Sequence, residues 1–136
     1  MAPQDVIPDV QPTKAERRQL TVMFCDLVGS TEMSTQLDPE DMRDVLLQYR
    51  EICAREIQLC GGFVAQYLGD GILAYFGYPQ AHEGDVANCL HAGQAIIQRL
   101  SEINDPPMQV RIGAATGTVV VGDVIAEHTT ESKSVV

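Results

Sequence analysis

The spacing of apolar positions changes along the chain, and each change predicts a new element. A buried strand is expected over residues 19–26, because its apolar residues alternate too little for a half-exposed strand. A short helix is expected over 30–37. A longer helix is predicted to start at residues 38–41, where an N-cap acid, a proline at the first helical position and further acids occur together. Its apolar residues recur every three or four positions up to Cys60, and the glycines at 61–62 end it.

A hairpin is expected next. Two β-prone runs, 63–68 and 72–76, flank the sequence Gly69-Asp70-Gly71, and an Asp-Gly step between such runs is typical of a tight β-turn.

The last third of the chain predicts a helix and two further strands. The helix is expected over 83–104, and the strands over 109–113 and 117–122, with a new strand starting at 134–136. The predicted order is β-α-α-β-β-α-β-β. This order favours the α+β class, in a ferredoxin-like or palm-like sandwich whose antiparallel-rich sheet carries its helices on one face.

The length of 136 residues suits one domain with a single core. Residues 1–16 contain three prolines among polar residues and are expected to be a disordered leader or linker. The domain is therefore predicted to span 17–136.

The net charge of the chain argues against some classes of binding partner. The net charge is −10, from 19 acids and 9 bases, and a surface this acidic repels nucleic acid and anionic membranes. An anionic small substrate can still bind if metal ions neutralise it locally. The sequence shows no apolar stretch near the roughly 20 residues of a membrane span and no signal peptide pattern. Four cysteines without a C-x-x-C pair are expected to be reduced structural thiols. A cytoplasmic location is expected.

Two aspartates stand where predicted strands end. Asp26 closes the run over 19–26, and Asp70 lies at the predicted hairpin tip. Taken separately, the first suits a helix N-cap and the second a plain turn. Together they suit the binding of two divalent cations over a nucleoside triphosphate. The turn over 27–31 supports this interpretation, because its small residues lead into a helix and its backbone N–H groups can hold phosphate.

Three motifs in order carry a resemblance to a known family. They are FCDLVGST at 24–31, YLGDGILAYF at 67–76 and RIGAATGTVVVG at 111–122. This set closely resembles the catalytic domain of class III nucleotidyl cyclases, the family of most adenylate and guanylate cyclases, and the wording resembles the bacterial type. The resemblance covers roughly residues 17–136.

The resemblance implies a metal-dependent site. Asp26 and Asp70 would bind two Mg²⁺ or Mn²⁺ ions, and the carbonyl of Leu27 would add a ligand. The backbone amides expected to hold the β- and γ-phosphates are those of Val28, Gly29, Ser30 and Thr31. The implied reaction forms 3′,5′-cyclic AMP and pyrophosphate from ATP.

Base selection departs from the family pattern. Many family members carry a lysine four residues before the second metal aspartate, where this chain has Gln66. Glutamine can donate and accept hydrogen bonds, so it suits either adenine or guanine. Ser134 matches the second selector position and favours ATP, with GTP as the alternative.

The resemblance also implies partners. Family sites form at the interface of a head-to-tail homodimer. The family's transition-state Asn and Arg follow the last strand, after the point where this sequence stops, so the fragment is expected to be inactive or very weak. Two alternatives stay open. One is a catalytically inactive cyclase-like module that binds nucleotide or dimerises. The other is a diguanylate cyclase or palm polymerase relative, although the Gly-Gly-Asp/Glu-Glu-Phe signature is absent.

Overall fold

The computed structural model describes residues 16–104 and 106–121. The elements, in chain order, are β1 (Glu16–Val28), α2 (Ser30–Gln36), α3 (Pro39–Leu59), β2 (Phe63–Leu68), β3 (Gly71–Phe76), α4 (Asp85–Ser101) and β4 (Gln109–Val121). The chain divides into two compact units. One spans Thr21–Thr116, and the described residues of the other are 16–20 and 117–121. The predicted leader, apart from residue 16, and the predicted strand at 134–136 lie outside the described residues.

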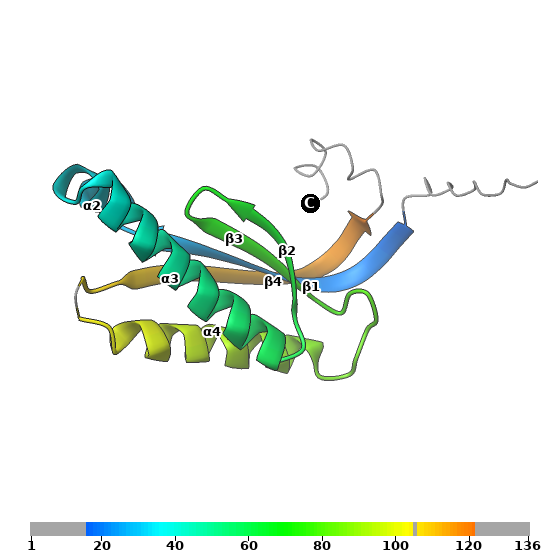
Figure 1. Cartoon of the computed structure of the whole chain (residues 1–136). Helices are drawn as coiled ribbons and strands as arrows, with labels where there is room; N and C mark the ends of the chain where they lie inside the picture. The colour runs from blue at the N-terminus through cyan, green and yellow to red at the C-terminus, as the bar shows by residue number, and fades with distance from the viewer. Residues whose placement is uncertain (1–15, 105, 122–136) are drawn as a thin grey trace, which may run out of the picture. The chain divides into compact units, whose positions relative to one another are not determined.

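The four strands form one antiparallel sheet in the order β2-β3-β1-β4. In the Thr21–Thr116 unit, α3 packs against α4 and β2, and α4 packs against β3. Figure 1 shows α3 and α4 on the same side of the β2–β3 hairpin. The predicted α+β class with a palm-like, antiparallel-rich sheet is confirmed.

The core lies between the sheet and the two long helices. Alternate residues of the inner strands point into it, because side chains on a strand alternate between its two faces. On β3 these are Ile72, Ala74 and Phe76, which are all fully buried. The buried residues of the core are Met23, Cys25, Leu27, Val45, Tyr49, Ile52, Cys53, Ile57, Ile72, Ala74, Phe76, Cys89, Ala92, Ile96, Leu100 and Met108.

Helix α3 begins and ends where the sequence predicts. Pro39 occupies its first turn. At the other end, Gly61 has φ 84°. Its N–H donates to the carbonyl of Gln58 at 3.0 Å, and the N–H of Gly62 donates to that of Ile57 at 2.8 Å. These two bonds form a Schellman motif, which satisfies carbonyls that the helix leaves unpaired.

The prediction of separate strands over 109–113 and 117–122 is wrong, because β4 is continuous from Gln109 to Val121. Neither Gly113 nor Gly117 adopts a positive φ, so the small residues between them keep an extended backbone and make no turn. Helix α4 is also shorter than its predicted range of 83–104. Within the described ranges, no helix combines the length and apolarity needed to cross a bilayer.

Candidate active site

Strand register brings the two predicted aspartates together. Asp26 on β1 is the antiparallel partner of Gly71 on β3, and Gly71 directly follows Asp70. Directly opposed residues in such a pair have Cα atoms roughly 5 Å apart. Two positions separated by 44 residues in the chain are therefore neighbours at one end of the sheet.

The site lies on the face of the sheet that the helices leave free. Cys25 and Leu27 point into the core, so Asp26 between them points to the opposite face. Its side chain is 35% exposed, which leaves the carboxylate accessible to a ligand.

Tyr49 on α3 lies close enough to Asp26 and Asp70 for both carboxylates to affect its pKa. Its side chain is fully buried, and its hydroxyl has no hydrogen-bond partner in the described part of the chain. Burial raises the pKa of the Tyr49 phenol. Four neighbouring groups raise this pKa further, and in order of effect they are Cys53, Cys25, Asp26 and Asp70. One phenol thus lies within electrostatic reach of both aspartates.

Each carboxylate contacts a polar side chain: Asp70 accepts a hydrogen bond, and Asp26 forms an ion pair. The hydroxyl of Ser30 donates a hydrogen bond to Oδ2 of Asp70. Nη1 of Arg111 on β4 lies 3.5 Å from Oδ2 of Asp26, and the Arg111 side chain is 70% exposed. Both contacts reduce the repulsion between two adjacent anions, which is also what a bound cation does.

Arg111 was not predicted as a site residue. Two features of the sequence could have indicated it: Arg111 is the only charged residue in β4, and it is the first residue of the third motif. Its ion pair with Asp26 joins positions 85 residues apart, and residue spacing alone does not predict such a contact.

The predicted phosphate turn connects β1 to α2. Leu27 is buried and Val28 ends β1, while Ser30 and Thr31 open α2. Gly29 between them has φ 76°, a conformation that favours glycine. The backbone therefore turns sharply beside Asp26.

Of the two predicted base-selecting residues, the structure describes only Gln66. Gln66 lies on β2 and pairs with Leu73 of β3, next to an irregularity in the register between Val64 and Gln66. Leu73 also pairs with Phe24 of β1, so Gln66 lies on the same helix-free face as Asp26. Ser134 lies outside the described residues.

The donor set fits a hard divalent cation. Within the described ranges, no cluster of three or more His, Cys, Asp or Glu side chains is positioned to hold a metal. Mg²⁺ in phosphate-transfer sites is commonly held by one or two carboxylates, with water and substrate phosphates completing the shell. Asp26 and Asp70, with the nearby backbone carbonyl of Leu27, match that pattern.

Comparisons with known proteins identify the family of this chain. The family model described as the adenylate and guanylate cyclase catalytic domain matches residues 13–131. An adenylate cyclase from Anabaena cylindrica is 33% identical over 135 residues, which cover 91% of this chain and 26% of that protein. The chain thus spans about a quarter of that relative's length.

Solved structures show the same fold. The adenylyl cyclase CyaB from P. aeruginosa superposes with a TM-score of 0.74 at 26% identity, over 79% of this chain and 60% of that one. The guanylyl cyclase Cya2 gives a TM-score of 0.67 at 32% identity, over 78% of this chain and 57% of that one. With the family match over most of its length, the chain belongs to the adenylate and guanylate cyclase catalytic domain family.

Proposed function

We propose that this chain is the catalytic module of an adenylate cyclase, which converts ATP to 3′,5′-cyclic AMP and pyrophosphate in intracellular signalling. The observation that carries the proposal is the meeting of Asp26 and Asp70 through the pairing of Asp26 with Gly71. The relative from Anabaena cylindrica, named an adenylate cyclase, supports ATP as substrate. The guanylyl cyclase Cya2 makes GTP the second candidate.

The proposed reaction is an in-line displacement. The ribose 3′-hydroxyl gives its proton to a water molecule, and its oxygen forms a bond to the α-phosphorus. The bond from that phosphorus to the oxygen bridging to the β-phosphate breaks, and pyrophosphate leaves with this oxygen. When bound, two Mg²⁺ or Mn²⁺ ions would supply positive charge that lowers the pKa of the hydroxyl and neutralises the leaving group. Asp26, Asp70 and the carbonyl of Leu27 would hold these ions.

The residues around the carboxylates have separate roles in this proposal. Ser30 holds Asp70 in place through its hydrogen bond. The backbone amides of Val28, Gly29, Ser30 and Thr31 bind the β- and γ-phosphates, because amides near a helix start lack partners within the helix. Arg111 beside Asp26 adds a positive charge that attracts the triphosphate.

Base selection is assigned to Gln66 and Ser134. Gln66 is half-buried and lies on the same sheet face as Asp26. Its amide offers both a donor and an acceptor to a base edge.

We propose that the module works as a homodimer with sites at the interface. Apolar side chains remain exposed on the helix-free face, including Phe24 at 43%, Phe63 at 40% and Leu68 at 44%. Apolar side chains that are exposed on one face of a sheet favour a protein interface there. ATP is a cytoplasmic substrate, so the module is proposed to act in the cytoplasm, with neither nucleic acid nor membrane as partner.

A non-catalytic nucleotide-binding module is the second candidate. The neutral Gln66 favours it, because it stands where many family members carry a lysine that reads the base.

A product assay separates these candidates. Purified protein is incubated with Mn²⁺ and either ATP or GTP, beside Asp70→Ala, and cyclic nucleotides are quantified by chromatography. We expect cyclic AMP from a protein extended past residue 136 to include the transition-state Asn and Arg, and none after Asp70→Ala or metal removal with EDTA in that same protein. Nucleotide binding without product favours the non-catalytic module, and faster cyclic GTP formation reverses the substrate assignment.

A further inference from the structure

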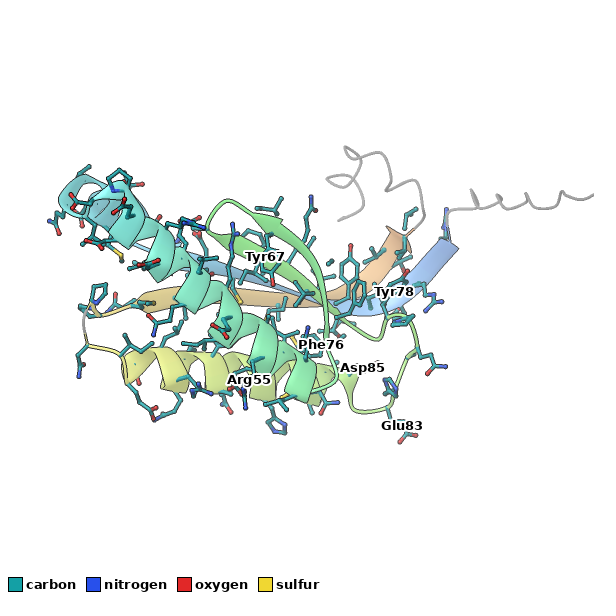
Figure 2. All side chains as sticks on the ribbon, in the orientation of Figure 1. Arg55, Tyr67, Phe76, Tyr78, Glu83 and Asp85 are labelled. Atoms are coloured by element: carbon teal, nitrogen blue, oxygen red, sulfur yellow. The ribbon has the colours of Figure 1, made fainter. Side chains whose placement is uncertain are left out.

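Arg50 on α3 reaches the tip of the β2–β3 hairpin. Its Nη2 donates a hydrogen bond of 2.7 Å to the carbonyl oxygen of Gly69. Its guanidinium carbon lies 5.0 Å from the centroid of the Tyr67 ring, a cation–π distance. Figure 2 labels Tyr67 within this hairpin. The two contacts involve different parts of a planar group, so together they fix its orientation.

The anchored carbonyl belongs to the peptide unit that leads into Asp70. Gly69 and Asp70 form the two-residue connection between β2 and β3, and Gly69 has φ 65°. Because a peptide unit is planar, fixing the Gly69 carbonyl also fixes the amide and the Cα atom of Asp70, from which its side chain leaves the backbone. The Ser30 hydroxyl holds the other end of that side chain.

Among the residues that the structure describes, no ion pair explains the position of Arg50. Within the described ranges, no carboxylate is paired with it, and its buried Nε has no hydrogen-bond partner. Burying an unpaired polar atom lowers stability. The contacts to Tyr67 and Gly69 are therefore the interactions that offset this penalty.

We propose that Arg50 is a positioning residue that orients Asp70 for cation binding. The inference rests on the metal site of the proposed function. Residues that orient metal ligands from outside the coordination shell typically change metal affinity about 10- to 100-fold when they are replaced. Arg50 acts on Asp70 through the backbone and not by direct contact with the ion.

The test compares Arg50→Ala, Arg50→Lys and Arg55→Ala. Arg55 is exposed on the same helix, as labelled in Figure 2, so its replacement removes the same charge without touching the hairpin. Mn²⁺ affinity is measured from the electron paramagnetic resonance signal of free Mn²⁺. Hydrogen exchange at residues 66–72 is followed by mass spectrometry, and the melting temperature is recorded for each variant.

Arg50→Ala is expected to weaken Mn²⁺ binding about tenfold and to speed exchange at the hairpin tip. Arg50→Lys should recover part of the affinity, because an ammonium group can still donate to the Gly69 carbonyl. Arg55→Ala should match the unmodified protein. Unchanged or tighter Mn²⁺ binding by Arg50→Ala overturns the inference, and so does unchanged exchange at the tip.

A fourth variant separates this inference from the proposed function. Asp70→Ala should lose the Mn²⁺ site. If Asp70→Ala loses it while Arg50→Ala keeps it, only the role of Arg50 fails. If Asp70→Ala binds Mn²⁺ normally, both the metal site and the inference fail.

Discussion

The two faces of the sheet in the Thr21–Thr116 unit differ in role: one forms the core, and the other carries the candidate site. On the helix-covered face, Ile72, Ala74 and Phe76 are fully buried. On the helix-free face, Phe24 stays 43% exposed, and Asp26, near the end of β1, has a side chain that is 35% exposed. Residues of both kinds alternate along β1, so a one-residue slip in register would exchange core and site. The packing of the core therefore also determines where the aspartates lie.

The largest predicted effect separates the site from the core. In a protein extended past residue 136, Asp26→Asn or Asp70→Asn should lower cyclase activity about 1,000-fold, because the metal charge acts mainly in the transition state. The melting temperature should change little, since neither side chain packs in the core. Product formation and thermal unfolding are measured on the same samples.

Asp41→Asn provides the control for this prediction, because it removes one exposed acid near the start of α3. It should keep full activity. If both site variants keep their activity, the two carboxylates are not needed for the reaction and the prediction is contradicted.

The second prediction tests whether α4 packs one of its faces on the helix-covered side of the sheet, and it compares two neighbouring residues of this helix. Ile96 is fully buried and Ile97 is 51% exposed. Ile96→Ala should lower the free energy of unfolding by about 3 kcal/mol, because it leaves a cavity in a packed core. Ile97→Ala should lower it by less than about 1 kcal/mol.

Urea denaturation of both variants measures this difference. Equal losses would mean that α4 does not present one face to the core.

The third prediction concerns alkaline pH. Burial raises the pKa of the Cys89 thiol from an ordinary value of 9.0 to about 11. A group whose folded pKa is raised stabilises the fold below its unfolded pKa and loses that contribution as pH rises toward the folded value. The free energy of unfolding should therefore fall between roughly pH 9 and pH 11. Burial also raises the pKa of Tyr49, and the hydrogen bond with Cys25, followed by burial, raises the pKa of Cys53, so both residues act in the same direction.

Urea denaturation across this pH range provides the measurement, with Cys89→Ala as the matched variant. That variant should lose stability less steeply as pH rises. An identical slope in both proteins would contradict the assignment of the decline to Cys89.

Local patterns predicted β1, the β2–β3 hairpin and the three helices, because strand ends, turn glycines and helical spacing are properties of adjacent residues. Helix α3 illustrates this, since Pro39 and the Gly61-Gly62 pair define its ends. The same reasoning failed at β4, where Gly113 and Gly117 look like turn residues but adopt no positive φ.

The neighbours of the aspartates were not predictable from spacing. Arg111 meets Asp26 from a different strand, and Arg50 meets the hairpin from a helix. The spacing of α3 places Tyr49 on its apolar face but does not show that this residue lies close to two carboxylates. These contacts depend on how the elements pack, and packing is a property of the folded chain.

The central claim is that Asp26 and Asp70 act on the same cations. A double-mutant cycle on Mn²⁺ affinity tests it most directly, with Asp26→Asn, Asp70→Asn and the double variant. Shared cations predict that each single variant loses nearly as much affinity as the double. Losses that simply add, or single variants that bind Mn²⁺ as well as the unmodified protein, would contradict a shared site.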